Sequence, residues 1–127
     1  DCSDNFATRF ALNRVCHELQ TPLVSGAAIR WDGQVTVFTG QPGGPCYRCL
    51  YTEEGEEELR CSENGVIAPL VGIIGAVQAL EAIKMLCSVG QPLAGRLLML
   101  DALRMQWREV RLRPDPACPV CSRQATT

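Results

Sequence analysis

Apolar positions along the chain recur at spacings that predict helices alternating with strands. A loosely helical rhythm follows the polar residues 1–5, which we interpret as a strand end with helix-capping side chains, and it stops at Thr21-Pro22 because proline cannot continue a helix. Short apolar runs predict four strands, and Asp32-Gly33 predicts a tight turn between the first two. The expected strands span residues 23–29, 34–39, 96–101 and 105–112.

The longest apolar segment runs from Val66 to Val89 and predicts one long helix over residues 65–87. It is long enough to cross a membrane, but it contains Glu81 and Lys84 well away from its ends, and a membrane span rarely carries two such charges. We therefore expect a helix that is buried in a globular domain. Because its apolar residues lie on nearly every face, it must be covered all round, which predicts a dimer or pairing with another segment.

Composition and charge narrow the class of protein. The 127 residues are 46% hydrophobic and 20% charged, which is typical of a single globular domain. The net charge is −2 and no block of basic residues is present, which argues against a nucleic-acid partner. The single histidine, His17, disfavours a histidine-rich metal centre or a Ser-His-Asp hydrolase. The polar start does not resemble a signal peptide, so we expect a cytoplasmic protein that binds no membrane.

Eight cysteines are many for this length, and four of them form two pairs with CxxC spacing. The pairs are Cys46 with Cys49 and Cys118 with Cys121. Two thiolate pairs can complete a tetrahedral site of four sulfurs, which suits Zn²⁺. Since such a site leaves no open coordination position, the expected zinc is structural rather than catalytic. Redox or disulfide chemistry of the pairs is the alternative.

Asp4 and Asn5 lie between the expected strand end and the first helix, where α/β proteins bind ligands. A carboxylate at this position can hold Mg²⁺ against a triphosphate, because hard cations prefer oxygen ligands. The simpler interpretation of Asp4 is a helix cap. The sequence contains neither GxGxxG nor GxxxxGKS, so any phosphate-binding loop would have to be supplied by another segment.

Cys61 lies in an acidic loop expected over residues 52–64, ahead of the long helix. Arg60 and the nearby helix N-terminus both favour its thiolate form, whereas the neighbouring glutamates oppose it. An ordinary loop cysteine is the alternative.

Taken together, these motifs resemble the MoeB/ThiF/HesA family, the bacterial relatives of ubiquitin-activating enzymes, and its MoeB members most of all. The resemblance follows the chain in order and covers almost all of it. It rests on residues 1–5, 22–28, 33–34, 45–49 and 65–84 and on the closing CxxC.

The resemblance implies an α/β fold: the C-terminal half of a Rossmann-like adenylyltransferase, with a mixed sheet, a long buried helix and a zinc knuckle. The family uses ATP and Mg²⁺ to adenylate the C-terminal glycine of a ubiquitin-like sulfur-carrier protein, for molybdopterin or thiamine synthesis, and its members form homodimers. Residues 1–127 would form one domain without the N-terminal nucleotide-binding half, and would be inactive alone. A non-catalytic, zinc-stabilised interaction module is the alternative function.

The resemblance also assigns roles to individual residues. The aspartate that contacts Mg²⁺ and ATP falls on Asp4, with Asn5 beside it. A cysteine that some members link covalently to the carrier falls on Cys61. The zinc ligands of the family fall on Cys46, Cys49, Cys118 and Cys121.

Overall fold

The computed structural model describes residues 1–51 and 65–122. Both long helices and all four strands that the apolar pattern predicts are present, whereas residues 1–5 form no strand. The elements in chain order are α1 (Phe6–Glu18), β1 (Leu23–Ile29), β2 (Asp32–Phe38), α2 (Tyr47–Leu50), α4 (Ala68–Cys87), β3 (Arg96–Asp101) and β4 (Gln106–Arg111).

The four strands form one sheet in the order β1-β2-β3-β4, and each neighbouring pair is antiparallel. The expectation of a mixed sheet is therefore wrong for the described strands. The first two strands form a hairpin, and so do the last two. The strands of a hairpin are antiparallel because its short turn reverses the direction of the chain. The first turn also lies earlier than expected: Ile29 pairs with Asp32, so the turn is formed by Arg30 and Trp31.

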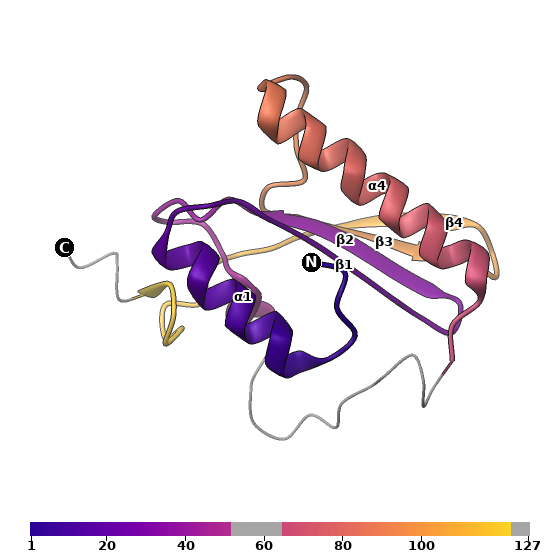
Figure 1. The fold of residues 1–127 in the computed structure, drawn as a ribbon, viewed down its shortest axis with the longest axis horizontal. Coiled ribbons are helices and arrows are strands. Elements are labelled where there is room, and N and C mark those ends of the chain that lie inside the picture. Colours follow the sequence, from indigo (N-terminus) through magenta and orange to yellow (C-terminus); the bar gives the residue numbers. More distant parts are fainter. Residues whose placement is uncertain (52–64, 123–127) are drawn as a thin grey trace.

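Helix α4 packs on one face of the sheet, across β1 and β2 (Figure 1). Its close approach requires small residues beneath it. A Cβ atom at Gly33 would lie 2.5 Å from Ile74 Cδ1 on the helix, so only glycine fits without displacing that side chain. The core formed in this way consists of Val35, Val37, Leu70, Ile74, Leu93 and Leu100.

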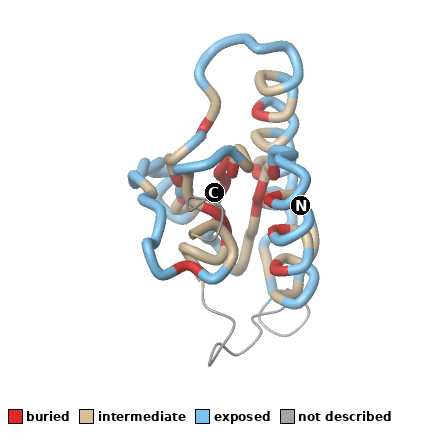
Figure 2. The backbone as a smooth tube through the Cα atoms, turned by 90° about the vertical axis from the view of Figure 1, so that its left-hand side faces the viewer, coloured by how far each residue is buried: buried red, intermediate tan, exposed pale blue. Residues whose placement is uncertain are grey.

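The outer side of α4 is exposed, which corrects the expectation of a buried helix. Leu70, Ile74 and Glu81 are its buried residues, whereas Leu86 is 85% exposed. The exposed positions of α4 are among those drawn in pale blue in Figure 2. The physical reason is geometric, because a single sheet face can cover only one side of a helix that is apolar all round.

Glu81 explains why a helix this apolar carries charge. Its Oε2 accepts a hydrogen bond from the Leu93 N–H at 2.8 Å, and its Oε1 lies 2.5 Å from Lys84 Nζ. By length and composition α4 is the one helix among the described residues that could cross a membrane. Its buried carboxylate instead anchors the start of the segment that leads into β3, as a core helix of a globular fold does.

The short helix α2 and helix α1 lie on the side of the sheet opposite α4 (Figure 1). An aromatic cluster joins them to the sheet: the rings of Phe10 and Tyr47 are 5.3 Å apart, and those of Phe38 and Tyr47 are 6.1 Å apart. Edge-to-face packing of this kind orients rings as well as burying them. It places the first turn of α1 and the residues of α2 beside each other, where both candidate sites are found.

Candidate functional site

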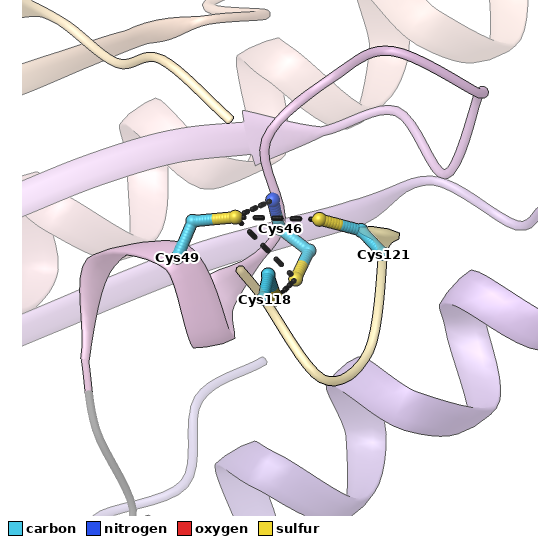
Figure 3. Close-up of side chains that lie close together, drawn as sticks. All are labelled: Cys46, Cys49, Cys118 and Cys121. Carbon is cyan, nitrogen blue, oxygen red and sulfur yellow. Dashed lines mark hydrogen bonds between the residues drawn. The ribbon is translucent and has the colours of Figure 1, made fainter. Parts of the chain in front are cut away.

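Two loops that are far apart in the sequence bring four cysteines together (Figure 3). Cys46 caps α2 and Cys49 lies within it, while Cys118 and Cys121 come from turns near the end of the described chain. The sulfur atoms of Cys46 and Cys118 are 3.6 Å apart, and those of Cys49 and Cys121 are 3.3 Å apart. All four sulfurs lie within 4.8 Å of one another. The four cysteines that the two CxxC motifs predict to share one site thus lie together in the structure.

The geometry of this thiol cluster matches a tetrahedral metal site. Four sulfurs at ~2.3 Å from a central zinc would be separated by about 3.8 Å. The separations of 3.3, 3.6 and 4.0 Å for Cys49–Cys121, Cys46–Cys118 and Cys46–Cys49 lie on both sides of that value. A disulfide would need about 2.05 Å, and all four cysteines are free. Backbone N–H groups of Cys46 and Asp115 donate to Cys49 Sγ, as expected around a bound thiolate.

Without a metal the cluster does not favour four negative charges. Burial raises the pKa of Cys46 to about 11, and burial likewise raises the pKa of Cys121, with the Cys49 thiol adding to the shift. At Cys118 burial also acts upward, but the N–H groups of Cys121 and Val120 outweigh it and lower the pKa. A divalent cation would supply the charge that allows all four sulfurs to be thiolates.

A second candidate site is a cavity of about 420 Å³ beside the first turn of α1. Its walls are that turn, the β1–β2 hairpin, the β3–β4 hairpin and the two tyrosines of the α2 region. Charges of both signs line it, which suits a ligand with its own charged groups. The charged lining residues are Asp4, Arg9, Asp32, Asp101, Arg104 and Arg108.

The structure separates the roles of Asp4 and Asn5. Asn5 is the N-cap of α1, and its Oδ1 accepts a hydrogen bond from the Thr8 N–H at 2.8 Å. Asp4 is therefore not the cap that its simpler interpretation suggested. Its side chain is exposed and lines the cavity, so its carboxylate is available for a ligand.

Arg9 holds the segment that carries Asp4, a role that the sequence did not reveal. Its guanidinium donates to the Ser3 carbonyl and, at 3.2 Å, to the Gly26 carbonyl on β1. It also lies 4.0 Å from the Asp1 carboxylate, whose other oxygen accepts the Ser3 N–H at 2.8 Å. These contacts tie residues 1–3 to the sheet and thereby set the position of the cavity wall.

Four cysteines do not belong to the thiol cluster: Cys2, Cys16, Cys61 and Cys87. Cys61 and the acidic residues around it lie outside the described residues. A free cysteine usually packs as a small apolar residue, but Cys2 and Cys87 are exposed and Cys16 is half-buried.

The ThiF family model matches residues 1–120. The chain belongs to the ThiF family. Among curated relatives, it is 55% identical over 121 residues to the molybdopterin-synthase adenylyltransferase of Escherichia coli K12, covering 95% of this chain and 49% of that protein. It is 48% identical over 124 residues to the adenylyltransferase and sulfurtransferase MOCS3 of Caenorhabditis briggsae, covering 95% of this chain and 31% of that protein.

This ThiF-family chain thus spans about half the length of the first bacterial relatives that it matches. Solved structures share its fold. The E. coli MccB structure with ATP superposes with a TM-score of 0.72 at 17% identity, covering 92% of this chain and 37% of that one. A heterocyclase structure with substrate and cofactor gives 0.70 at 14% identity, covering 91% and 19%. These similarities confirm the expected α/β fold.

Proposed function

We propose that this ThiF-family chain is part of an ATP-dependent adenylyltransferase that activates the C-terminal glycine of a ubiquitin-like sulfur-carrier protein for molybdopterin synthesis. The 55% identity to a molybdopterin-synthase adenylyltransferase over 95% of the chain carries this proposal. The names of the two bacterial relatives favour molybdopterin over thiamine as the product of the pathway.

These residues would act as the C-terminal half of the adenylyltransferase domain. The chain spans 49% of that bacterial relative and has no glycine-rich phosphate loop. The other half would supply this loop and most donors to the phosphates. The 127-residue chain alone should therefore adenylate nothing, because phosphoryl and adenylyl transfer depend mainly on positioning and charge neutralisation.

Within the complete site, Asp4 would hold Mg²⁺ against the triphosphate, with Asn5 fixing the helix end behind it. The exposed Asp4 carboxylate on the cavity wall supports this role, since hard cations select oxygen ligands. The carrier's terminal carboxylate oxygen would attack the α-phosphorus of ATP, and pyrophosphate would leave. The cavity would hold the extended glycine tail during this step.

The thiol cluster would hold one structural Zn²⁺ through Cys46, Cys49, Cys118 and Cys121. The sulfur separations and the closed set of four ligands support zinc over a redox role. When bound, the ion would tie the C-terminal segment to α2 and so to the side of the cavity formed by Tyr47 and Tyr51.

In the full-length protein the Cys61 thiolate would attack the carbonyl carbon of the adenylated glycine, so that a thioester to the carrier forms and AMP leaves. We expect Cys61→Ser to abolish a carrier adduct that is sensitive to thiols, because a serine at this position offers no sulfur to the activated glycine. Cys87→Ser is the matched control, since Cys87 is an exposed cysteine at the end of α4. Mass spectrometry under non-reducing conditions measures the adduct, and an adduct of wild-type yield in Cys61→Ser would exclude the role.

Helix α4 would pair with a second copy of the protein or with the other half of the domain. Leu80, Ile83 and Leu86 are 60, 53 and 85% exposed, and a Cβ placed at Gly72 or Gly75 would meet open space as far as the described residues go. Burying apolar surface contributes about 25 cal/mol per Å², so a face of this kind favours association.

We expect the chain to be dimeric at micromolar concentrations and the double variant Leu80→Lys, Ile83→Lys to be monomeric. Leu19→Lys is the control, because Leu19 is 70% exposed but lies after α1. Sedimentation velocity distinguishes the species. A wild-type chain that stays monomeric at high micromolar concentration would contradict self-association through α4.

A non-catalytic interaction module is the second candidate function, and the uncovered face of α4 favours it. Both candidates are compatible with a soluble cytoplasmic protein without nucleic-acid or membrane partners. Trapping the carrier acyl-adenylate from the full-length protein, ATP and Mg²⁺ separates them. An adenylate that requires the carrier's terminal glycine supports the enzyme, whereas carrier binding without any adenylate supports the module.

A further inference from the structure

Asn13 is a buried polar residue that contacts the backbone between the two CxxC cysteines. It lies on α1, is 3% exposed, and its Oδ1 accepts the Tyr47 N–H at 3.0 Å. Tyr47 directly follows Cys46, so this bond places the Asn13 carboxamide beside the first cysteine of the cluster. The Asn13 side chain on α1 is thus hydrogen-bonded to the first residue of α2.

The other end of the Asn13 carboxamide has no partner of normal hydrogen-bond geometry. Its Nδ2 is buried without an acceptor among the described residues, although buried donors are nearly always satisfied. Asn13 and Cys46 line the same small void, and the Tyr47 N–H that holds Asn13 Oδ1 belongs to the residue directly after Cys46. The residue with the unsatisfied amide nitrogen is therefore a neighbour of Cys46 in the fold.

We propose that Asn13 is a positioning residue of the metal-loaded cluster, which donates its Nδ2–H to the Cys46 thiolate. The inference rests on the proposed zinc site. Metal binding converts a neutral thiol, which accepts hydrogen bonds weakly, into a thiolate, which accepts them well. The donor that lacks a partner in the metal-free protein would gain one when the metal binds.

The consequence is a link between the metal and the cavity. Asn13 lies eight residues after Asn5 on the same helix, about 12 Å along its axis at 1.5 Å per residue. The carboxamide joins the cluster to α1 in the second half of the helix, while Asp4 and Arg9 line the cavity at the other end. Metal occupancy would thereby help to hold α1, and with it the cavity wall.

Asn13→Asp tests the donor, because a carboxylate keeps an oxygen for the Tyr47 N–H but offers no N–H group to the sulfur. We expect a 10- to 100-fold loss of Zn²⁺ affinity, about the size found for other residues that orient metal ligands. Competition with a chromophoric chelator measures the affinity. The cobalt-substituted chain should also show a shifted sulfur-to-metal charge-transfer band.

Thr36→Val is the matched control. Thr36 is also buried, at 2% exposure, and its hydroxyl donates to the carbonyls of Leu93 and Arg96. It is not among the cluster residues, so its loss should lower the melting temperature and leave Zn²⁺ affinity within twofold. Equal affinities and equal cobalt spectra for the wild type and Asn13→Asp would overturn the proposal.

A measurement on the wild-type chain removes any dependence on the folding of the variant. With ¹¹³Cd in the cluster and ¹⁵N-labelled asparagine, one Nδ2 proton of Asn13 should couple to the metal through the N–H···S hydrogen bond. Absence of that coupling in a cadmium-loaded chain would overturn the role of Asn13 alone. A wild-type chain that binds neither zinc nor cadmium would instead overturn the metal site and the inference together.

Discussion

Replacing Cys118 by serine is expected to abolish tight zinc binding and to release the C-terminal segment from α2. Cys118 is fully buried, and its sulfur lies 3.6 Å from that of Cys46, so a hydroxyl there removes one of four ligands from the centre of the cluster. Structural zinc sites contribute on the order of 10 kcal/mol of apparent binding energy. Metal content by elemental analysis should fall from one zinc per chain to near zero, with a large fall in melting temperature.

Two controls make this result specific. Cys87→Ser removes an exposed cysteine that is outside the cluster and should retain one zinc per chain. Chelation of the wild type should loosen the segments around Cys46 and Cys118 together, because the ion would join them. A wild-type chain with no metal and with disulfides within the two CxxC pairs would show that the cluster is redox-active instead.

Asp4→Ala should lower carrier-dependent ATP–pyrophosphate exchange by the full-length protein roughly 10²- to 10³-fold, the scale on which loss of one charge-stabilising group acts. The physical reason is loss of the carboxylate that would hold Mg²⁺. The fold should be retained, since Asp4 is exposed and Asn5, not Asp4, caps α1.

Glu18→Ala is the matched control for charge, because Glu18 is an exposed acid at the far end of the same helix. It should leave exchange unchanged. If the Asp4→Ala protein exchanges pyrophosphate within twofold of the wild type, Asp4 does not hold the metal ion. The other proposals do not depend on this result.

The sequence was informative where local patterns decide the structure. The strands at Leu23–Ile29 and Arg96–Asp101 were predicted with the bounds observed, because short apolar runs between turn residues leave few alternatives. Proline and glycine likewise marked helix ends. The four clustered cysteines could be paired in advance because CxxC spacing directs both sulfurs of a pair to one ion.

Burial could not be predicted in the same way. The composition of α4 indicates an apolar helix but not which of its sides is covered, and the side that carries Leu86 is exposed. The strand directions also depend on connections between distant segments. The antiparallel pairing of β2 with β3, across Val35 and Leu98, is set by where α4 returns the chain to the sheet.

The residues that support the two sites could not be predicted from the sequence either, because they act through tertiary contacts. The bonds of Arg9 to Gly26 and of Asn13 to Tyr47 join positions 17 and 34 residues apart. No spacing rule predicts such pairs. Asp4 also had two competing interpretations, which the observed Asn5 cap separates.

ATP–pyrophosphate exchange is the most direct test of the proposed function, with the full-length protein and the 127-residue chain measured side by side. We predict exchange by the full-length protein that requires Mg²⁺ and a sulfur carrier with an intact terminal glycine, and none by the 127-residue chain. Robust exchange by the 127-residue chain would contradict the proposed division of the active site. Absence of exchange by the full-length protein with its carrier would contradict the adenylyltransferase function itself.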